Sequence, residues 1–414
     1  MNGNEIIQLG LGIIEPWKIT GQILDTSKQP NELRLTLQAD RGTKFPCPVC
    51  GKLCKVHDFK KMTWRHLNFF QHHCSITASV PRTKCSEHGV KRITVPWARK
   101  GSKFTLLFEQ AALVLVKEMP VLAAARIMEI TDKRLWRIVL HYVNTALKQF
   151  DLSKLQAFSL DETKGRRGHR YITIFIDLDR KENPVVFATP GKGKKTLSQF
   201  KEFLENKGGA AENVVEVVAD MSSAFIAGIK EHFTKSRITV DWFHVVQLLT
   251  KALEKVRRAE SKEATMHRGT RWAILKKSEG EFTEKQLDAL AELTALDLHT
   301  ATAWRVKELL RWVRRADSVR GAKWRLTWFL HVARELVEGI DLLAPVRTAL
   351  NTIEKHRHAI ESRWISGHSN ARIEALNGIF QAAKARARGF RKDETFISMI
   401  YLLASPVQDI LEST

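Results

Sequence analysis

Apolar and polar positions alternate with different periods in different parts of the chain. Around residues 33–37 apolar side chains occupy every second position, which indicates a strand, and residues 1–45 are expected to form short strands of this kind. Residues 103–150 repeat their apolar positions with the period of a helix. Residues 245–365 are almost entirely helical in pattern and rich in Lys, Arg, Glu and Trp, and residues 368–412 predict two or three more helices.

The segment between residues 155 and 245 mixes the two patterns. In chain order it predicts strands at 158–161, 171–178 and 184–188, a helix at 196–207, a strand at 214–220, a helix at 222–233 and a strand at 238–241. Strands interleaved with helices favour a mixed α/β sheet. The order also matches the ribonuclease-H-like sheet, in which the first strand lies beside the fourth.

The composition adds a strong positive charge. The 414 residues carry a formal net charge of +22, and the isoelectric point is near 9.9. This excess indicates a polyanionic partner such as nucleic acid, with a solvated basic surface as the alternative. No apolar run reaches the roughly 18 residues that cross a bilayer, and the start of the chain lacks the features of a signal peptide. We therefore expect a cytoplasmic protein with no membrane contact.

All five cysteines lie in one short stretch of the chain. It contains a CxxC pair and, after strand-like sequence, a CxxH pair of the same spacing. Two such pairs predict a zinc ribbon with three cysteines and one histidine as ligands of a structural Zn²⁺. The predicted ligands are Cys47, Cys50, Cys85 and His88. Cys54 and Cys74 are alternatives for a ligand position, or are buried free thiols.

Residues 119–130 predict one helix, and residues 133–142 predict a second, basic and amphipathic helix that starts after Thr131 and Asp132. Alanines in the first helix and a short turn before the second are typical of a helix-turn-helix, although any helical hairpin has a similar pattern. The second helix would then lie in the major groove of DNA. Its expected DNA-facing cations are Lys133, Arg134 and Arg137, and its expected core residues are Leu135, Ile138 and Val139.

Carboxylates end two of the predicted strands. Asp161 ends the first strand and Asp220 the fourth, and neighbouring strands would bring both to one edge of the sheet, where a packed helix would add Glu374. Three carboxylates suit two Mg²⁺ (or Mn²⁺) ions, which activate a water or a 3′-hydroxyl and stabilise the leaving oxygen of a phosphodiester. Asp161, Asp220 and Glu374 are therefore the candidate catalytic residues and metal ligands.

Other acidic residues compete with these three. Asp177 ends the second strand and is expected to lie away from the metal. Asp241 ends the fifth strand. Together with His244 it could support the metal ligands or contact DNA, or it could simply cap the helix that follows.

Several short motifs occur in an order that resembles the bacterial insertion-sequence transposases of the ISL3 family, within the DDE class. They are 160–164 with 168–171, 219–221 with 224–225, 241–245, and Ser369 and Asn370 with Glu374, Asn377 and 388–390. The ribbon and the helix-turn-helix also stand in the matching order, so the resemblance covers nearly the whole chain. Two departures are His88, where a cysteine is expected, and Trp242, where an arginine is common.

The resemblance implies that Asp161, Asp220 and Glu374 are a catalytic triad. Candidates for residues that support this triad are Asp241, His244 and Asn377. The resemblance also implies that the protein binds double-stranded DNA, both the terminal inverted repeats of its insertion sequence and a target, and that it cleaves and transfers strands. Because two ends must be held together, we expect a homodimer or larger assembly at the nucleoid.

The expected fold class is multidomain α/β. The domains are a zinc ribbon at 1–100, a helix-turn-helix at 101–152, a ribonuclease-H-like core at 153–248 and 366–414, and an all-helical insertion at 249–365. Most tryptophans of the insertion are expected in a helical core, with one or two free to stack on an unpaired base; they are Trp272, Trp304, Trp312, Trp324, Trp328 and Trp364.

Basic side chains in the insertion and after Glu374 are candidates for phosphate contact, with a solvated face as the alternative. In the insertion they are Arg257, Arg258, Arg268, Arg271, Arg314, Arg315 and Arg320, and after Glu374 they are Lys384, Arg386 and Arg388.

Two other functions remain open. A DNA-binding regulator would use the ribbon and helix-turn-helix and carry an inactive ribonuclease-H-like domain, but the intact set of three carboxylates argues against it. A metal-dependent nuclease would cut without joining, and the sequence separates it poorly from a transposase.

Overall fold

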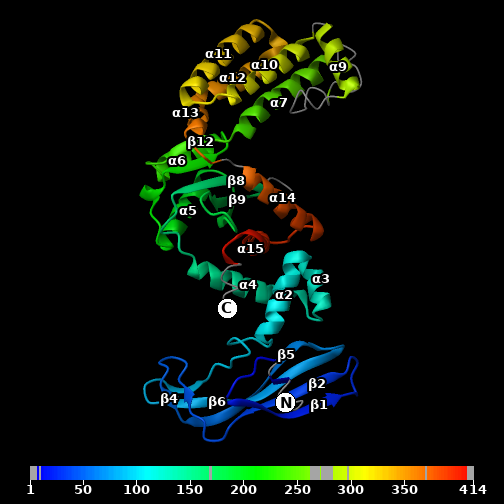
Figure 1. The fold of residues 1–414 in the computed structure, drawn as a ribbon, viewed down its shortest axis with the longest axis vertical. Helices are drawn as coiled ribbons and strands as arrows, with labels where there is room; N and C mark the ends of the chain where they lie inside the picture. The colour runs from blue at the N-terminus through cyan, green and yellow to red at the C-terminus, as the bar shows by residue number, and fades with distance from the viewer. Residues whose placement is uncertain are drawn as a thin grey trace. The chain divides into compact units, whose positions relative to one another are not determined.

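The computed structural model describes residues 7–8, 11–166, 170–261, 271, 283–295, 298–368 and 371–407. Contacts within the chain form two compact units, Met1–His141 and Tyr142–Thr414. Both units combine β-sheet with α-helix, which confirms the predicted multidomain α/β class (Figure 1).

A five-stranded sheet forms most of the first unit. Its strands are β1 (Trp17–Asp25), β2 (Glu32–Ala39), β5 (Val56–Phe69), β6 (His72–Cys85) and β7 (Gly89–Arg92), in the order β1-β2-β6-β5 with β7 against β6. Strands β2 and β6 run parallel and the other pairs run antiparallel. The alternation predicted at 33–37 is confirmed, because Leu33, Leu35 and Leu37 are buried.

Tryptophans fill the core of this sheet. The ring of Trp97 meets those of Trp17 and Trp64 edge-on, with centroids 4.9 and 5.7 Å apart, a geometry that adds to the energy of their burial. All three side chains are almost fully buried. The sheet therefore has an apolar core that does not depend on the cysteines predicted to bind zinc.

Three helices follow the sheet: α2 (Leu106–Glu118), α3 (Val121–Ile127) and α4 (Asp132–Gln149). Helix α2 begins at Thr105, whose side chain accepts a hydrogen bond from the N–H of Phe108. Helix α3 is shorter than the helix predicted at 119–130. Met119 is extended, and Glu129 has a left-handed φ of 53°, so the helical run is interrupted on both sides.

The sheet of the second unit has five strands in the order β10-β9-β8-β11-β12. They are β8 (Ala157–Arg166), β9 (Arg170–Asp177), β10 (Val185–Pro190), β11 (Glu216–Ala219) and β12 (Arg237–Val240). The first three strands are antiparallel, whereas β11 is parallel to both β8 and β12. This is the order of the ribonuclease-H-like sheet, and the prediction that the first strand lies beside the fourth is confirmed.

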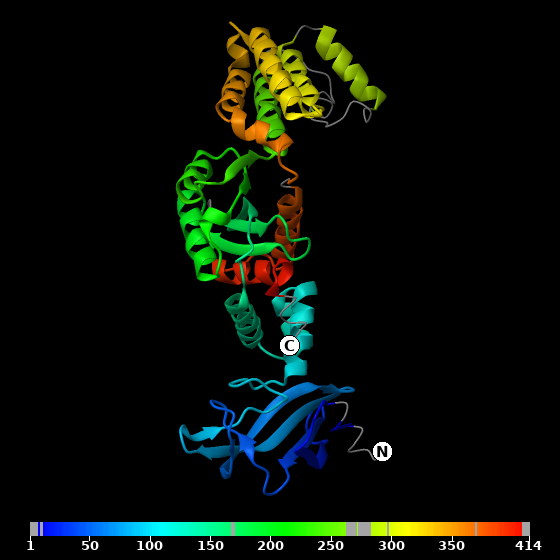
Figure 2. The same cartoon turned by 60° about the vertical axis from the view of Figure 1, so that its left-hand side comes forward.

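Helices cover both faces of this sheet. In both views α5 (Lys194–Asn206) and α6 (Ser223–His232) lie on one side and α14 (Ala371–Arg386) on the other (Figures 1 and 2). Phe200 from α5 stacks on Phe175 at 4.4 Å and meets Phe158 at 4.9 Å. This aromatic core fixes β8 and β9, and hence the position of Asp161.

Helix α15 (Asp393–Ala404) packs along the edge strand β10. The buried hydroxyl of Tyr401 accepts a hydrogen bond from the N–H of Ala188 at 3.0 Å. We expect Tyr401→Phe to lower the free energy of unfolding by about 1–3 kcal/mol, because this N–H would lose its buried acceptor. Urea unfolding followed by circular dichroism measures the change. Tyr171→Phe, at a half-buried site, is the control, and equal stability of the two variants would contradict the prediction.

Between β12 and α14 the described residues form helices joined by short turns and loops. The helices are α7 (Trp242–Glu260), α9 (Glu284–Ala295), α10 (His299–Arg314), α11 (Val319–Val337), α12 (Ala344–Lys355) and α13 (Arg357–Glu361). The buried carboxylate of Glu260 accepts the N–H groups of His299 and Thr300 at 2.8 Å each, which ties the end of α7 to the start of α10. Among the described helices, none combines the length and apolar character that a membrane span requires.

The tryptophans of this insertion are less buried than predicted. Trp324 is 62% exposed and Trp328 39% exposed, and both rings pack edge-on against Trp312. Trp304, Trp312 and Trp364 are half-buried, whereas Trp272 lies outside the described residues. The core of the insertion is mostly aliphatic, with Trp304 and Trp364 packed against it, so the prediction of a tryptophan core is wrong for Trp324 and Trp328.

Candidate active site, zinc centre and DNA-binding helix

The register of the parallel strands places three aspartates side by side. Val218 of β11 pairs with Ser159 of β8, an offset of 59 positions (218 − 159), and the same offset sets Asp220 beside Asp161. Ala219 pairs with Val240 of β12, so Asp220 is also level with Asp241.

The sequence predicted that Asp161 ends its strand, and this prediction is wrong. Parallel pairing with β11 stops at Ser159, but β8 continues to Arg166 because it stays paired with β9. Asp161 therefore stands where β11 has already ended, on a strand that stays paired with β9.

Two hydrogen bonds orient Asp161. Nδ2 of Asn377 donates to its Oδ2 at 2.7 Å, and the N–H of Glu162 donates to its Oδ1 at 2.7 Å. Burial raises the pKa of Asp161 and the carboxylate of Asp220 adds to this effect, while Glu162 N–H, His244 and Asn377 oppose it. Each of these crowded carboxylates thus disfavours the charged form of the other. A bound cation would offset this repulsion.

Glu374 lies beside Asp241 and His244. It is in the first turn of α14, while Asp241 directly precedes α7 and His244 is in the first turn of α7. One possible ligand atom from each residue lies within 4.8 Å of the others. Asp161 and Asp220 are not part of this three-residue group. The structure therefore sets two subsites next to each other, Asp161 with Asp220, and Glu374 with Asp241 and His244.

Two further sequence expectations concern Asp177 and Asp241. Asp177 pairs with Phe158, toward the opposite end of β8 from Asp161, so it lies away from the other carboxylates as expected. Asp241 occupies the N-cap position of α7, but its side chain makes no capping hydrogen bond. The interpretation of Asp241 as a helix cap is therefore wrong.

Three charged or titratable residues near the carboxylates were not predicted. Burial raises the pKa of Glu162, with Asp220 adding to the rise and Lys192 opposing it. His356 is close enough to Asp220 for their charges to interact. The sequence could have indicated that Glu162 lies near the site, because it directly follows Asp161. Lys192 and His356 come from distant segments, and no local pattern marks them.

A cavity of about 500 Å³ borders Asp241 and Glu374. Helix α10 supplies three cations to its lining and the segment after α13 supplies a fourth; they are Lys307, Arg311, Arg314 and Arg363. Guanidinium and ammonium groups around a cavity suit phosphate oxygens. Of the four, Arg314 was among the predicted phosphate contacts.

The other predicted phosphate contacts have different surroundings. Arg257 and Arg258 both donate to Glu254, at 2.8 and 3.0 Å, and Arg271 lies 3.7 Å from the same carboxylate. Nζ of Lys384 donates to the carbonyl oxygen of Lys164 at 2.6 Å, which fixes α14 to β8. Four of the predicted phosphate contacts have exposed side chains: Arg315, Arg320, Arg386 and Arg388. Outside the described residues are Arg268, the motif positions 168–169, Ser369 and Asn370.

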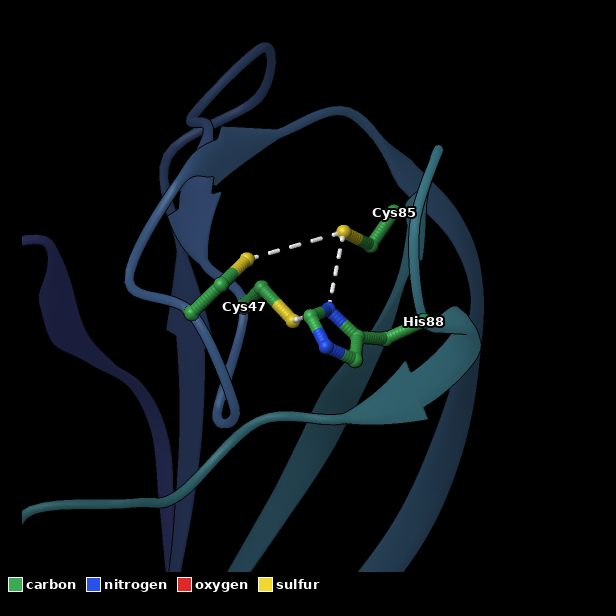
Figure 3. Close-up of side chains that lie close together, drawn as sticks. Cys47, Cys85 and His88 are labelled. Carbon is green, nitrogen blue, oxygen red and sulfur yellow. Dashed lines mark hydrogen bonds between the residues drawn. The ribbon is translucent and has the colours of Figure 1, made fainter.

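Four side chains converge in the first unit as predicted: Cys47, Cys50, Cys85 and His88. Sγ of Cys85 lies 3.6 Å from Nδ1 of His88 and 3.7 Å from Sγ of Cys50, and Sγ of Cys47 lies 3.9 Å from the same nitrogen (Figure 3). Tetrahedral ligands of Zn²⁺, bound at 2.0–2.3 Å, are about 3.5–3.8 Å apart. The four residues therefore fit a structural zinc ion.

The backbone prepares these thiols for a metal. The short strands β3 (Phe45–Pro46) and β4 (Leu53–Cys54) carry the first pair on a hairpin, and the second pair lies at the turn from β6 to β7. The N–H groups of Glu87 and His88 lower the pKa of Cys85 to about 7. A lowered thiol pKa favours the thiolate, which is the form that binds metal.

Neither of the two remaining cysteines joins this group. Sγ of Cys54 donates to the carbonyl oxygen of Lys52 at 3.3 Å. Cys74 is buried in β6, and burial raises its pKa to about 11, so it is a neutral thiol. Cys74 is thus the buried free thiol that the sequence offered as an alternative.

Helix α4 separates its cations from its apolar face. Lys133, Arg134 and Arg137 are exposed, as predicted. The residues predicted to pack inward, Leu135, Ile138 and Val139, are almost completely buried. The exposed face therefore carries the charge that a recognition helix needs.

We expect the combined replacement of Lys133, Arg134 and Arg137 by Ala to weaken DNA binding and to flatten its salt dependence. Each phosphate contact that is lost should reduce the slope of log K against log salt by about 0.9. Titration of a labelled duplex at several salt concentrations measures the slope. Lys148→Ala, in the last turn of the same helix, is the control. An unchanged slope in the triple variant would remove α4 from the DNA interface.

A zinc-binding ribbon, a helix-turn-helix and a carboxylate-bearing ribonuclease-H-like sheet together define a DDE-type DNA transposase. Comparison with known families agrees over most of the chain. Residues 43–88 match a zinc-finger family of insertion-sequence transposases, residues 93–143 match the helix-turn-helix domain of transposase family ISL3, and residues 158–400 match the ISL3 DDE transposase family. The last match alone covers more than half of the 414 residues.

Curated relatives give the same result. The transposase for insertion sequence element IS1557 of Mycobacterium tuberculosis is 27% identical over 387 residues, covering 86% of this chain and 85% of the relative. The transposase for insertion sequence element IS1001 of Bordetella parapertussis is 24% identical over 368 residues, covering 86% and 87%. The chain belongs to the ISL3 family of transposases.

Proposed function

We propose that this transposase binds the terminal inverted repeats of its own insertion sequence, cleaves them and joins them to a target duplex. In this proposal Asp161, Asp220 and Glu374 are the catalytic residues. The observation that carries it is the strand register, which sets Asp220 beside Asp161. Helix α14, which carries Glu374, is fixed along β8 by Gln381, whose Nε2 donates to Oγ1 of Thr163 at 2.7 Å.

The donor groups fit Mg²⁺ or Mn²⁺, which take carboxylate oxygens as ligands. Asp241 is buried, and its Oδ2 has no hydrogen-bond partner among the described residues. Burial and the neighbouring Asp220 raise the pKa of Asp161. This is the expected effect where neighbouring carboxylates repel one another and a cation would stabilise their charged forms. When bound, two such ions supply activation of the attacking water or 3′-hydroxyl and stabilisation of the leaving oxygen.

The protein itself positions the groups around the scissile phosphate. Asn377 holds Asp161 in one orientation through its hydrogen bond. The cations that line the cavity beside Glu374 would bind DNA phosphates, and α4 would lie in the major groove. The proposed domains are 1–100, 101–152, 153–248 with 366–414, and 249–365. Since two ends must be held at once, we propose that the active form is a homodimer or a larger assembly.

A cleavage and joining assay tests this function. It supplies the purified protein with Mg²⁺, labelled duplexes of the element's own ends and an unlabelled target duplex. Cleaved ends joined to the target are the expected products. Cleavage without joined product would favour the nuclease, and specific binding without metal-dependent cleavage would favour the regulator.

A further inference from the structure

The group of Asp241, His244 and Glu374 is distinct from the predicted triad. It contains an imidazole, and it excludes both Asp161 and Asp220. Ligands bound to one octahedral ion at about 2.1 Å lie no more than about 4.2 Å apart. The three ligand atoms lie within 4.8 Å of one another, a bound close to this limit, so small side-chain rotations would bring the three residues onto one ion.

Buried polar atoms without partners collect at this place. Asp241 is only 5% exposed, and its Oδ2 has no hydrogen-bond partner within the described parts of the chain. The same holds for Nε2 of His244 and for Oδ1 of Asn377, one turn after Glu374. Burying polar atoms without partners costs free energy, and folded proteins usually avoid it. Several such atoms in one place therefore indicate a site that binds a ligand.

Protein groups do not account for these atoms. Asp241 stands at the N-cap of α7, yet its side chain does not cap the helix. The guanidinium of Arg363 is close enough to interact electrostatically with Asp241, and burial lowers its pKa. Among the described residues, however, no hydrogen bond satisfies Asp241 Oδ2.

The sequence builds this group with local and tertiary constraints. Positions 241 and 244 are three residues apart, so they share one face of the first helical turn. Trp242, between them, is buried and packs edge-on against Trp364 at 5.6 Å. This contact anchors the start of α7, while strand β12 keeps Asp241 level with Asp220.

We propose that Asp241, His244 and Glu374 bind a divalent cation of the first transition series, such as Mn²⁺, in preference to Mg²⁺. Two carboxylates and one imidazole form a mixed oxygen and nitrogen set. Mg²⁺ is bound almost entirely through oxygen, whereas transition-metal dications readily accept an imidazole. The inference deepens the proposed function, on which its catalytic meaning rests, by assigning His244 as a direct metal ligand.

Electron paramagnetic resonance with Mn²⁺ tests the proposal on the full-length, zinc-loaded protein without DNA. Pulsed measurements on bound Mn²⁺ detect a directly bonded nitrogen. The wild type is expected to show this nitrogen coupling. His244→Gln should lose it and bind the ion at least about tenfold more weakly, since even the loss of groups that only support ligands costs this much. Absence of nitrogen coupling in the wild type at saturating Mn²⁺ would overturn the proposal.

Matched variants identify the nitrogen and guard against misfolding. His356→Gln changes a second histidine near the carboxylates, one whose charge interacts with that of Asp220, and it should keep the coupling. Asp177→Asn changes a carboxylate at the end of β9, opposite Phe158, and should leave Mn²⁺ affinity unchanged. Zinc content and thermal unfolding show that each variant is folded. Loss of the coupling in His356→Gln, with retention in His244→Gln, would contradict the assignment.

This experiment is separate from the test of transposition. Nitrogen coupling with no DNA cleavage would overturn the proposed function and leave the metal site standing. Cleavage and joining by a wild type without nitrogen coupling would overturn the metal site and leave the proposed function standing.

Discussion

Replacing Asp220 with asparagine is expected to reduce end cleavage and joining by about 1000-fold or more. Asp220 is level with both Asp161 and Asp241, so it is the central carboxylate of the row that the strand register creates. An amide has the same shape but lacks the charge that holds a divalent cation. The loss therefore removes several kcal/mol of transition-state stabilisation, and each 1.36 kcal/mol corresponds to a factor of ten in rate.

Asp177→Asn is the matched control for this loss. It makes the same chemical change toward the other end of the same sheet, and cleavage should stay near the wild-type rate. DNA binding by Asp220→Asn should persist, since α4 and the ribbon are unchanged. Normal cleavage by Asp220→Asn would remove this residue from the catalytic set.

Replacing Cys85 with serine is expected to release the zinc ion and to destabilise the first unit. Zinc in small finger domains contributes about 10–16 kcal/mol of apparent binding free energy, and thiolate ligands carry much of it. In this chain the sheet keeps the apolar core around Trp97, so we expect the β3–β4 hairpin and the β6–β7 turn to lose their order first. Zinc analysis of the purified protein and thermal unfolding measure the two effects.

Two variants make this prediction specific. Cys54→Ser changes a neighbouring thiol that is not among the four converging ligands, and it should keep a full zinc content. His88→Cys supplies a thiolate in place of the imidazole and should also keep the metal, because structural zinc is commonly bound either by cysteines alone or by cysteines together with a histidine. A stoichiometric zinc content in Cys85→Ser would show that the ion binds elsewhere.

The sequence was sufficient for those parts of the fold that depend on local pattern. Alternating leucines located β2, CxxC and CxxH spacing located the zinc ligands, and the order of strands placed Asp161 beside Asp220. The length of β8 was missed because an antiparallel partner extends a strand beyond its apolar core. The end of α3 was missed because the left-handed turn at Glu129 is not signalled by a glycine.

The sequence suggested that Asp241 and His244 could support the metal ligands, but it did not predict that they group with Glu374 apart from Asp161 and Asp220. This grouping depends on how α14 is fixed across β8, which is a tertiary contact between distant segments. It also depends on the direction in which α7 follows β12. Exposure of Trp324 and Trp328 likewise depends on which face of α11 the insertion buries. Periodicity locates the apolar face of a helix, but it does not decide whether aromatic residues at the edge of that face are buried or exposed.

The separation of Asp241 from Glu374 by the whole helical insertion has a consequence for synthesis. Because domains fold as the chain leaves the ribosome, Asp241 and the strand before it emerge well before α14. A nonsense or frameshift mutation anywhere between α7 and α13 yields a chain that keeps the ribbon and the helix-turn-helix but never receives Glu374. Under the proposed function, such a product would occupy the same DNA ends without cutting them, so a damaged copy of the gene would encode a competitor of the intact protein.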